Sequence, residues 1–163
     1  MASICPEEKR RACVFEGTFF QYEYHGCGPE GSPNPLEVTL DTHALVWYLD
    51  SSLNDRLSAL ALQTIDDAET AGRIHLSVIV LAEILHLSEK GRINLDYSAL
   101  YRKIVDSAPY VIESLTPEVL TIAVGLKGLE LHDRIILATA IHTQSALISK
   151  DIELRQYPAN VIW

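Results

Sequence analysis

Four acidic residues occupy positions from which their carboxylates could act together. Asp41 directly follows a short stretch of alternating apolar residues that has the pattern of a β-strand, and Asp151 follows a second, buried-type strand. Asp133 lies in the first turn of a predicted helix. Glu83 lies inside the apolar helical segment VIVLAEILHLSEK, where a buried carboxylate needs a partner or a metal ion. We therefore treat these four acids as a candidate site.

Carboxylates that converge repel one another, and protons or cations must relieve that repulsion. A set of hard oxygen ligands suits Mg²⁺ or Mn²⁺. One or two such ions could orient a water molecule against a phosphodiester and stabilise the leaving oxygen. Taken alone, each acid also has a structural explanation. Asp41 or Thr42 suits a helix N-cap, Asp133 suits the positive end of a helix dipole, Asp151 suits a turn, and Glu83 could face solvent.

Apolar periodicity predicts the elements that would position these acids. Strands are predicted over residues 36–40, 73–76, 110–112, 146–148 and 160–162. Helices are predicted over residues 42–49, 54–71, 78–90, 97–107, 117–125 and 132–143. Strands that alternate with helices favour an α/β fold in three α/β/α layers, with a mainly parallel central sheet of about five short strands. Ligand sites in such sheets form at the carboxyl ends of the strands.

Composition and charge limit the classes of protein to which this chain can belong. With 163 residues, of which 48% are hydrophobic, the sequence supports one domain with a substantial core. We expect a cytoplasmic protein with no membrane anchor, because no apolar run has the length of a transmembrane helix or of a secretory signal. The formal net charge of −9 argues against nucleic-acid binding through a broad basic surface. It does not exclude a nucleic-acid enzyme whose acidic site is filled by metal ions.

Residues 1–35 differ in composition from residues 36–163. They contain all three cysteines and end in the turn-rich segment GCGPEGSPNP. A zinc site is conceivable from four residues of this part of the chain, but their spacing lacks the paired C-x₂-C of common zinc sites. These four residues are Cys5, Cys13, His25 and Cys27. We expect an atypical, poorly ordered N-terminal extension, followed by a single domain over residues 36–163.

Five segments of residues 36–163 form an ordered set: LDTHALVWYLD, SVIVLAEILHLSEKGRI, LHDRIILATA, ISKD and the terminal VIW. Together they resemble the PIN-domain ribonucleases, and within them the VapC-type toxins of bacterial toxin–antitoxin pairs. The resemblance implies a PIN fold and metal-dependent endonucleolytic cleavage of RNA. It implies Asp41, Glu83, Asp133 and Asp151 as the catalytic residues and as the ligands of Mg²⁺ or Mn²⁺. It also implies a homodimer, and inhibition by a cognate antitoxin protein whose tail enters the groove.

The sequence departs from the family pattern near two of these acids. Related sequences often carry Asp-Pro-Ala-Asp-Arg where this chain has Glu-Leu-His-Asp-Arg, so Glu130 could supply the extra acid. His43 stands where other PIN branches have Asn or Ser, and it could contact a phosphate or an acid. Arg134 and Lys150 could offset the charge of the adjacent acids, touch substrate or face solvent. The auxiliary candidates are Thr42, His43, Glu130, Arg134 and Ser149.

Two other functions are compatible with the sequence. A catalytically inactive PIN-like module that binds RNA or protein would fit the low basic content and the departure at residues 130–133. A phospho-accepting signalling domain would fit an acidic pocket with a Ser149–Lys150 pair, although no obvious acceptor aspartate follows a central strand.

Overall fold

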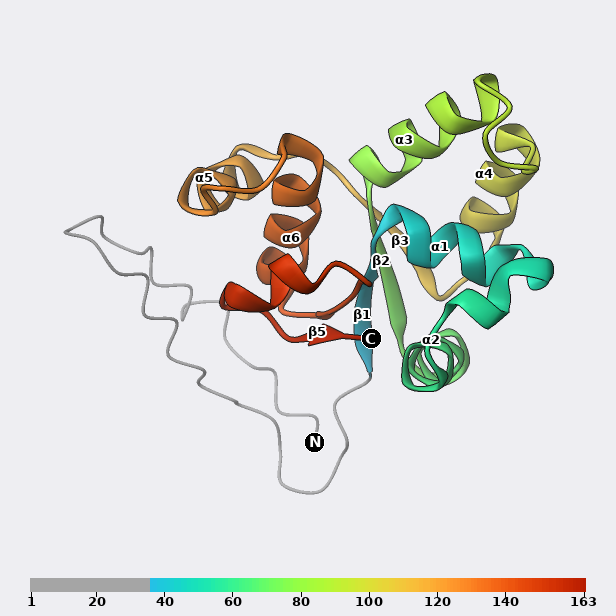
Figure 1. Ribbon diagram of the computed structural model, residues 1–163, viewed down its shortest axis with the longest axis horizontal. Coiled ribbons are helices and arrows are strands. Elements are labelled where there is room, and N and C mark those ends of the chain that lie inside the picture. The colour runs from blue at the N-terminus through green and yellow to red at the C-terminus, as the bar shows by residue number, and fades with distance from the viewer. Residues whose placement is uncertain (1–35) are drawn as a thin grey trace, which may run out of the picture. The chain divides into compact units, whose positions relative to one another are not determined.

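The computed structural model describes residues 36–163, and Figure 1 shows how their helices and strands are arranged. The N-terminal extension predicted over residues 1–35, with its conceivable zinc site, lies outside the described residues. The predicted domain boundary therefore stays a prediction. Within residues 36–163, no helix has both the length and the apolar character that a membrane crossing requires.

One sheet of five parallel strands forms the centre of the fold. The strands are β1 (Glu37–Leu40), β2 (Arg73–Ser77), β3 (Tyr110–Glu113), β4 (Ala146–Ile148) and β5 (Val161–Ile162). Their order in the sheet is β3-β2-β1-β4-β5, so β1 is central and pairs with β2 on one side and with β4 on the other. The prediction of a parallel sheet of about five short strands is confirmed.

Helices cover this sheet in the described part of the chain. The α-helices are α1 (Thr42–Leu49), α2 (Ala59–Ala71), α3 (Val78–Glu89), α4 (Tyr97–Asp106), α5 (Pro117–Gly125) and α6 (Leu131–Thr143). The 3₁₀-helices are η2 (Ser51–Arg56) and η3 (Ile152–Gln156). Helix α6 packs against β1, β2 and β4, whereas α2 packs against β1 and β2. Figure 1 shows these two helices on opposite sides of the strands, which agrees with the predicted layers.

The helix predicted over residues 54–71 is wrong at its start. Residues Ser51–Arg56 form the 3₁₀-helix η2, and α2 begins only at Ala59. Ser58 causes the break, because its backbone is extended and its hydroxyl accepts the N–H of Ala61 at 3.0 Å, which caps a new helix. A local cap therefore outweighs the apolar periodicity that runs across it.

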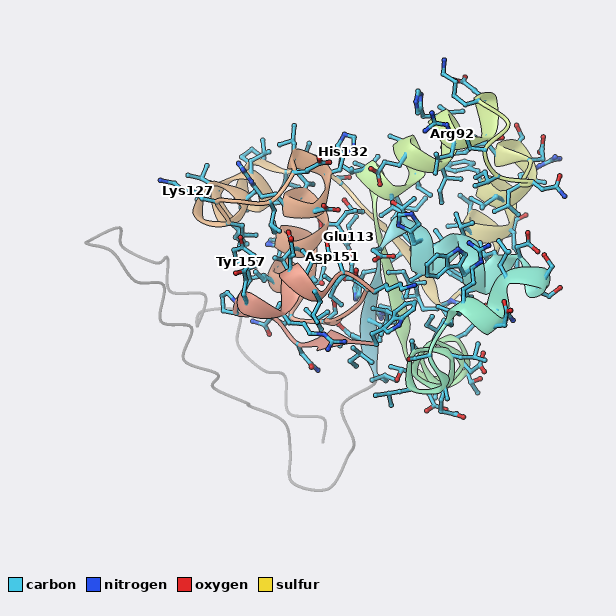
Figure 2. The ribbon with its side chains drawn as sticks, viewed as in Figure 1. Arg92, Glu113, Lys127, His132, Asp151 and Tyr157 are labelled. Atoms are coloured by element: carbon cyan, nitrogen blue, oxygen red, sulfur yellow. The ribbon has the colours of Figure 1, made fainter. Side chains whose placement is uncertain are left out.

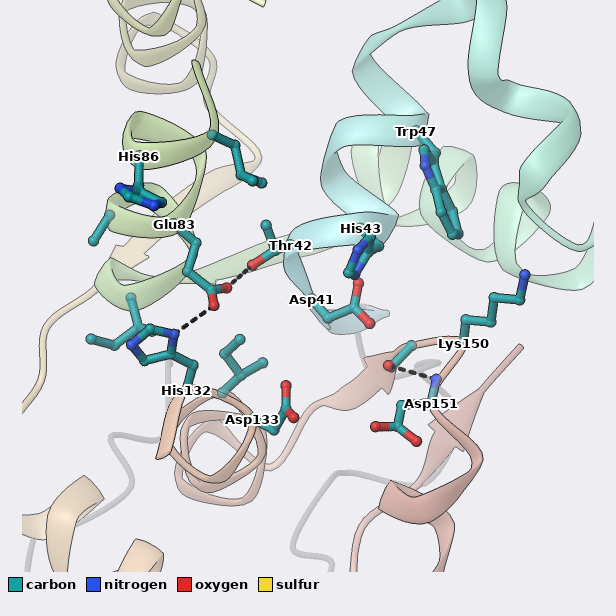
Figure 3. Close-up of a pocket in the computed structure, with 15 residues that line it drawn as sticks. Asp41, Thr42, His43, Trp47, Glu83, His86, His132, Asp133, Lys150 and Asp151 are labelled. Atoms are coloured by element: carbon teal, nitrogen blue, oxygen red, sulfur yellow. Dashed lines mark hydrogen bonds and ion pairs between the residues drawn. The ribbon is translucent and has the colours of Figure 1, made fainter. Parts of the chain in front are cut away.

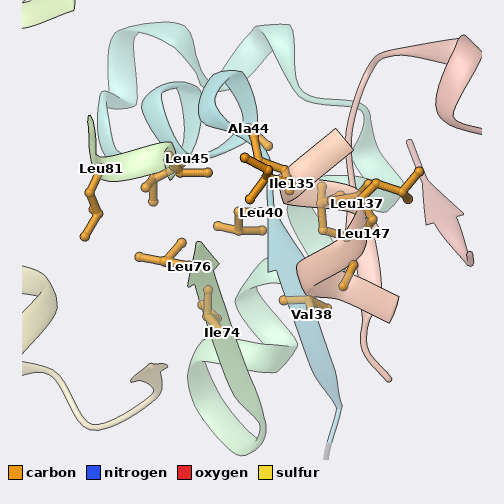
Figure 4. Close-up of a cluster of buried hydrophobic side chains, with 14 of the residues drawn as sticks. Val38, Leu40, Ala44, Leu45, Ile74, Leu76, Leu81, Ile135, Leu137 and Leu147 are labelled. Atoms are coloured by element: carbon orange, nitrogen blue, oxygen red, sulfur yellow. The ribbon is translucent and has the colours of Figure 1, made fainter. Parts of the chain in front are cut away.

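The hydrophobic core surrounds β1 on both faces. Val38, Leu40 and the polar Thr39 between them are all 0% exposed, so the alternation of apolar and polar residues in this strand does not mark a solvated face. The hydroxyl of Thr39 is satisfied by a hydrogen bond to the hydroxyl of Ser145 at 2.6 Å. Figure 4 shows the apolar side chains around β1, among them Leu45, Ile74, Leu76, Leu137 and Leu147.

Tyr157 ties together two segments that lead to or from the predicted site residues. Tyr157 directly follows η3, and its hydroxyl donates to the carbonyl oxygen of Lys127 at 2.7 Å. Figure 2 labels both residues. Gly128 follows with a φ of 101°, which favours glycine, and a Cβ there would lie 3.3 Å from the Tyr157 hydroxyl. The contact holds the segment after Asp151 against the segment before Asp133.

A buried histidine bridges three neighbouring strands. His75 in β2 is 6% exposed, and each of its ring nitrogens faces a carboxylate. Nδ1 lies 2.7 Å from an oxygen of Glu113 in β3, and Nε2 lies 3.3 Å from an oxygen of Glu37 in β1. An ionised carboxylate only accepts hydrogen bonds, so a ring nitrogen of His75 that carries hydrogen donates to the carboxylate that it faces. Side chains thus reinforce the main-chain pairing of these strands.

We expect the substitution His75→Leu to lower the free energy of unfolding by about 2–3 kcal/mol, because two partly buried carboxylates lose their shared donor. Chemical denaturation at neutral pH measures this change. The control is His142→Leu at an exposed position of α6, which is expected to change stability by less than about 0.5 kcal/mol. Equal small effects of the two substitutions would show that the His75 bridge contributes no stability.

Candidate functional site

One pocket of about 730 Å³ lies where the ends of β1 and β4 meet helices α1, α3 and α6, as Figure 3 shows. All four acids that the sequence singled out line it. The lining residues are Asp41, Thr42, His43, Trp47, Ile79, Ala82, Glu83, His86, Leu87, His132, Asp133, Ile136, Ser149, Lys150 and Asp151. The fold therefore brings together four acids from four separate segments.

Asp41 reaches the pocket from the carboxyl end of the central strand. β1 pairs in parallel with β4, with Leu40 opposite Ile148, so the residues after both strands emerge at the same edge of the sheet. The N–H of Asp41 donates to the carbonyl oxygen of Ile148 at 3.2 Å. Its carboxylate accepts the N–H of Ala44 at 2.6 Å as the N-cap of α1. Asp41 is thus both a helix cap and a lining residue of the pocket.

Asp151 combines the same two properties at the neighbouring strand. Its carboxylate accepts the N–H of Glu153 at 2.8 Å and so caps η3. Its own N–H donates to the hydroxyl of Ser149 at 3.1 Å, and Ser149 is 1% exposed. The structural and the functional explanations of these acids therefore do not exclude each other.

Glu83 enters the pocket from the middle of α3, and both of its carboxylate oxygens have partners. Oε2 accepts a hydrogen bond from the hydroxyl of Thr42 in α1. Oε1 lies 2.7 Å from Nδ1 of His132, near the start of α6. A carboxylate inside an apolar helix is thereby paired, as the cost of burying it requires. Figure 3 shows how these two bonds link three helices around the pocket.

The pKa of Asp41 is raised above its usual value, chiefly because the carboxyl is buried. The backbone N–H of Ala44, the hydroxyl of Ser149 and the nearby His43 each lower it. The neighbouring charge of Glu83 raises it again. The effects of burial and of the Glu83 charge, which raise the pKa of Asp41, are therefore larger than the effects of the hydrogen bonds and of His43, which lower it.

The pKa of Asp133 is also raised, and here repulsion has a larger part. Burial is the main cause, followed by the charges of Asp151, Glu83, Glu130 and Asp41 in decreasing order. Asp133, which stands in the first turn of α6, is thus under the influence of all three other acids of the pocket. The four carboxylates behave as one electrostatic cluster.

The donor chemistry of this cluster suits a divalent cation. The four acids supply only oxygen atoms, and the raised pKa values of Asp41 and Asp133 indicate charge that the protein does not fully compensate. In the arrangement found for residues 36–163, no three His, Cys, Asp or Glu side chains lie close enough together to hold one ion. Binding of one ion by three or more of these carboxylates would therefore require them to lie closer together.

The auxiliary candidates divide into two groups. Three line the pocket, namely Thr42, His43 and Ser149. Glu130 does not line it, although its charge raises the pKa of Asp133. Arg134 does not line it either, because its guanidinium donates to the carbonyl oxygen of Leu129 at 3.1 Å. Arg134 thus supports the loop before α6.

Among the lining residues with an indole or imidazole ring, three were assigned no functional role by the sequence analysis. His132 directly precedes the third acid and binds Glu83. His86 lies three residues after Glu83, so it shares a face of α3 with that acid. Trp47 lies four residues after His43 on α1. Helical spacing from a predicted site residue is the signal that could have identified His86 and Trp47.

In the absence of divalent cations, we expect Asp133→Asn to raise the denaturation midpoint at pH 7. The folded state raises the pKa of Asp133, so it binds this proton more tightly than the unfolded state does. Stability contributed by this group therefore falls as the pH rises above the unfolded value of 3.8. The difference in denaturation midpoint between Asp133→Asn and the wild type should therefore shrink as the pH falls towards 3.8. Urea denaturation at several pH values measures this difference.

The exposed Asp106 on α4 provides the control for this measurement, because Asp106→Asn should leave the midpoint nearly unchanged. A lower midpoint for Asp133→Asn at pH 7 would contradict the repulsion inferred among these acids.

The solved structures with a similar fold include the following three. VapBC2 from Rickettsia felis, bound to a DNA fragment of its promoter, matches with a TM-score of 0.58 and 15% identity over 78% of this chain and 99% of that chain. FitAcB from Neisseria gonorrhoeae matches with a TM-score of 0.57 and 19% identity over 77% and 96% of the two chains. A toxin–antitoxin complex from Klebsiella pneumoniae gives 0.54 and 20% over 77% and 96%. At these identities the likeness shows the fold.

Comparisons of the amino-acid sequence identify the family to which the chain belongs. A comparison with curated protein sequences finds no match. A family model described as the PIN domain matches residues 38–160, which is well over half of the chain and includes all four acids of the pocket. The chain therefore belongs to the PIN-domain family.

Proposed function

We propose that this protein is an endoribonuclease that requires Mg²⁺ or Mn²⁺ and acts as the toxin of a toxin–antitoxin pair. The observation that carries the proposal is that Asp41, Glu83, Asp133 and Asp151 line one pocket. Membership of the PIN family supports a nuclease. A toxin–antitoxin complex among the structural neighbours supports the toxin role.

In this proposal the four carboxylates hold the divalent cation. The bound cation supplies Lewis-acid chemistry, which lowers the pKa of a water molecule and stabilises charge on the leaving oxygen of a phosphodiester. The protein's own residues prepare the ligands. Thr42 and His132 orient the carboxylate of Glu83, and Ser149 favours the ionised form of Asp41.

A second candidate function is a catalytically inactive PIN-like module that binds RNA or protein. Two observations favour it: no three ligand side chains within residues 36–163 converge on one point, and both oxygens of Glu83 already have partners. The two candidates differ in whether bound RNA is cleaved.

We expect purified full-length protein to cleave RNA in Mn²⁺ or Mg²⁺ and to lose this activity in EDTA. Asp133→Asn should lower the cleavage rate at least about 100-fold, because the cation loses one carboxylate of its ligand set. Denaturing gels with end-labelled RNA measure the rate. Asp106→Asn, which changes an exposed acid of α4, should cleave like the wild type.

Equal cleavage by the wild type and by Asp133→Asn would assign the activity to a contaminant and contradict the proposal. RNA binding without cleavage by the wild type would favour the inactive module instead.

The toxin role also calls for partner proteins and a location in the cytoplasm, where cellular RNA is accessible. We propose a homodimer, which would cover some of the exposed apolar side chains Val124, Leu131 and Ile152.

We further propose a cognate antitoxin whose tail enters the groove. A small reading frame immediately upstream should encode a DNA-binding protein, and co-expression of its product should suppress ribonuclease activity. Undiminished activity in the complex would contradict the toxin role and leave the nuclease proposal intact.

A further inference from the structure

One end of the acidic pocket is formed by an aromatic cluster that the four acids do not explain. Trp47 lines the pocket, and its ring lies 5.4 Å from the ring of His43, which also lines the pocket. Trp163 packs edge-on against Trp47 at 5.8 Å. These are the only two tryptophans of the chain, and they are separated by more than a hundred residues. The fold thus places both large indole rings beside the candidate site.

Two cations accompany this cluster. The ammonium of Lys150 lies over the ring of Trp47 at 5.6 Å, and the guanidinium of Arg56 lies over it at 5.9 Å. Both cationic residues are exposed, and Lys150 also lines the pocket. Figure 3 shows Lys150 and Trp47 on the side of the pocket opposite to His86. In a chain with a net charge of −9, this is a local concentration of positive charge beside an acidic pocket.

The combination matches what single-stranded RNA presents. A flat base stacks on an aromatic side chain, and the phosphates on either side of it attract ammonium and guanidinium groups. The acids of the pocket repel the same phosphates, so cations beside them are needed to hold the strand close to the pocket. A purely structural role for the half-buried Trp47 would account for its contact with Trp163 but not for the two exposed cations over its ring.

We propose that Trp47, Lys150 and Arg56 form a nucleotide subsite in which a base of single-stranded RNA stacks on Trp47 and the adjoining phosphate is bound by the two cations. This inference rests on the proposed function and deepens it, because it names the residues that bind the RNA substrate beside the cleaved bond. A base can replace Lys150 over the indole, since stacking of a base is worth more than an exposed cation–π contact. The displaced ammonium then lies free to bind the phosphate.

The test measures binding apart from hydrolysis. Full-length protein with the substitutions Asp133→Asn and Trp163→Phe, in EDTA, has Trp47 as its one tryptophan. A short single-stranded oligonucleotide of 2′-O-methyl RNA should quench the fluorescence of Trp47 with a saturable dependence on concentration. Trp47→Ala in the Asp133→Asn background should weaken binding of the same labelled oligonucleotide roughly 10-fold, and Trp47→Phe should restore part of the loss. Lys150→Ala should weaken binding and reduce its salt dependence.

Matched controls come from another surface of the domain. Tyr101 on α4 is 42% exposed and stacks on Tyr97 at 6.1 Å, and neither tyrosine lines the pocket. Tyr101→Ala and the nearby Lys103→Ala should leave the affinity for the oligonucleotide unchanged. If Trp47→Ala does not fold, the quenching of Trp47 fluorescence still decides the matter, because it needs no substitution of that residue.

The outcomes separate this inference from the proposed function. Two results would overturn the proposed subsite even if the wild type cleaves RNA. One is the absence of quenching, and the other is that folded Trp47→Ala binds the oligonucleotide as tightly as the Asp133→Asn protein from which it is made. Quenching and weakened binding support the subsite even if the wild type, loaded with Mn²⁺, does not cleave. In that second case the proposed hydrolysis fails and the domain is an RNA-binding module.

Discussion

Repulsion among carboxylates in one pocket is the constraint on which the rest of this structure depends. Burial and like charge raise the pKa values of Asp41 and Asp133, so the ionised pocket costs stability in the folded protein. A protein keeps such an arrangement only when the surrounding structure holds it in place. Here Thr42 and His132 hold Glu83, and two of the other acids are fixed by capping a helix.

The scaffold meets this constraint through the position of β1. As the central strand it is buried on both faces, and its carboxyl end is therefore fixed by pairing on each side. Strand β4 delivers a second acid to the same edge, and helices α3 and α6 deliver the other two. The bridge from His75 to Glu37 and Glu113 strengthens the other half of the sheet. Helices thus carry Glu83 and Asp133, whereas Asp41 and Asp151 follow paired strands and cap the helix that comes next.

Local sequence patterns predict these elements well, because strand ends, caps and apolar periodicity are properties of neighbouring residues. Asp41 and Asp151 could be placed at strand ends and Asp133 in a first helical turn for that reason. The hydrogen bond from His132 to Glu83 could not be predicted, since the two residues are 49 positions apart and meet only in the fold. The contact of Trp47 with Trp163 has the same cause. The start of α2 was missed because the cap at Ser58 interrupts an apolar pattern.

The central claim is that this cluster of carboxylates binds a divalent cation, and titration calorimetry with Mn²⁺ tests it most directly. The full-length protein, first treated with EDTA, should bind Mn²⁺, and Glu83→Gln should lose most of that affinity. Glu89→Gln, which changes an exposed acid of the same helix, should bind like the wild type. Absence of Mn²⁺ binding by the wild type, or equal affinities of all three proteins, would contradict the account.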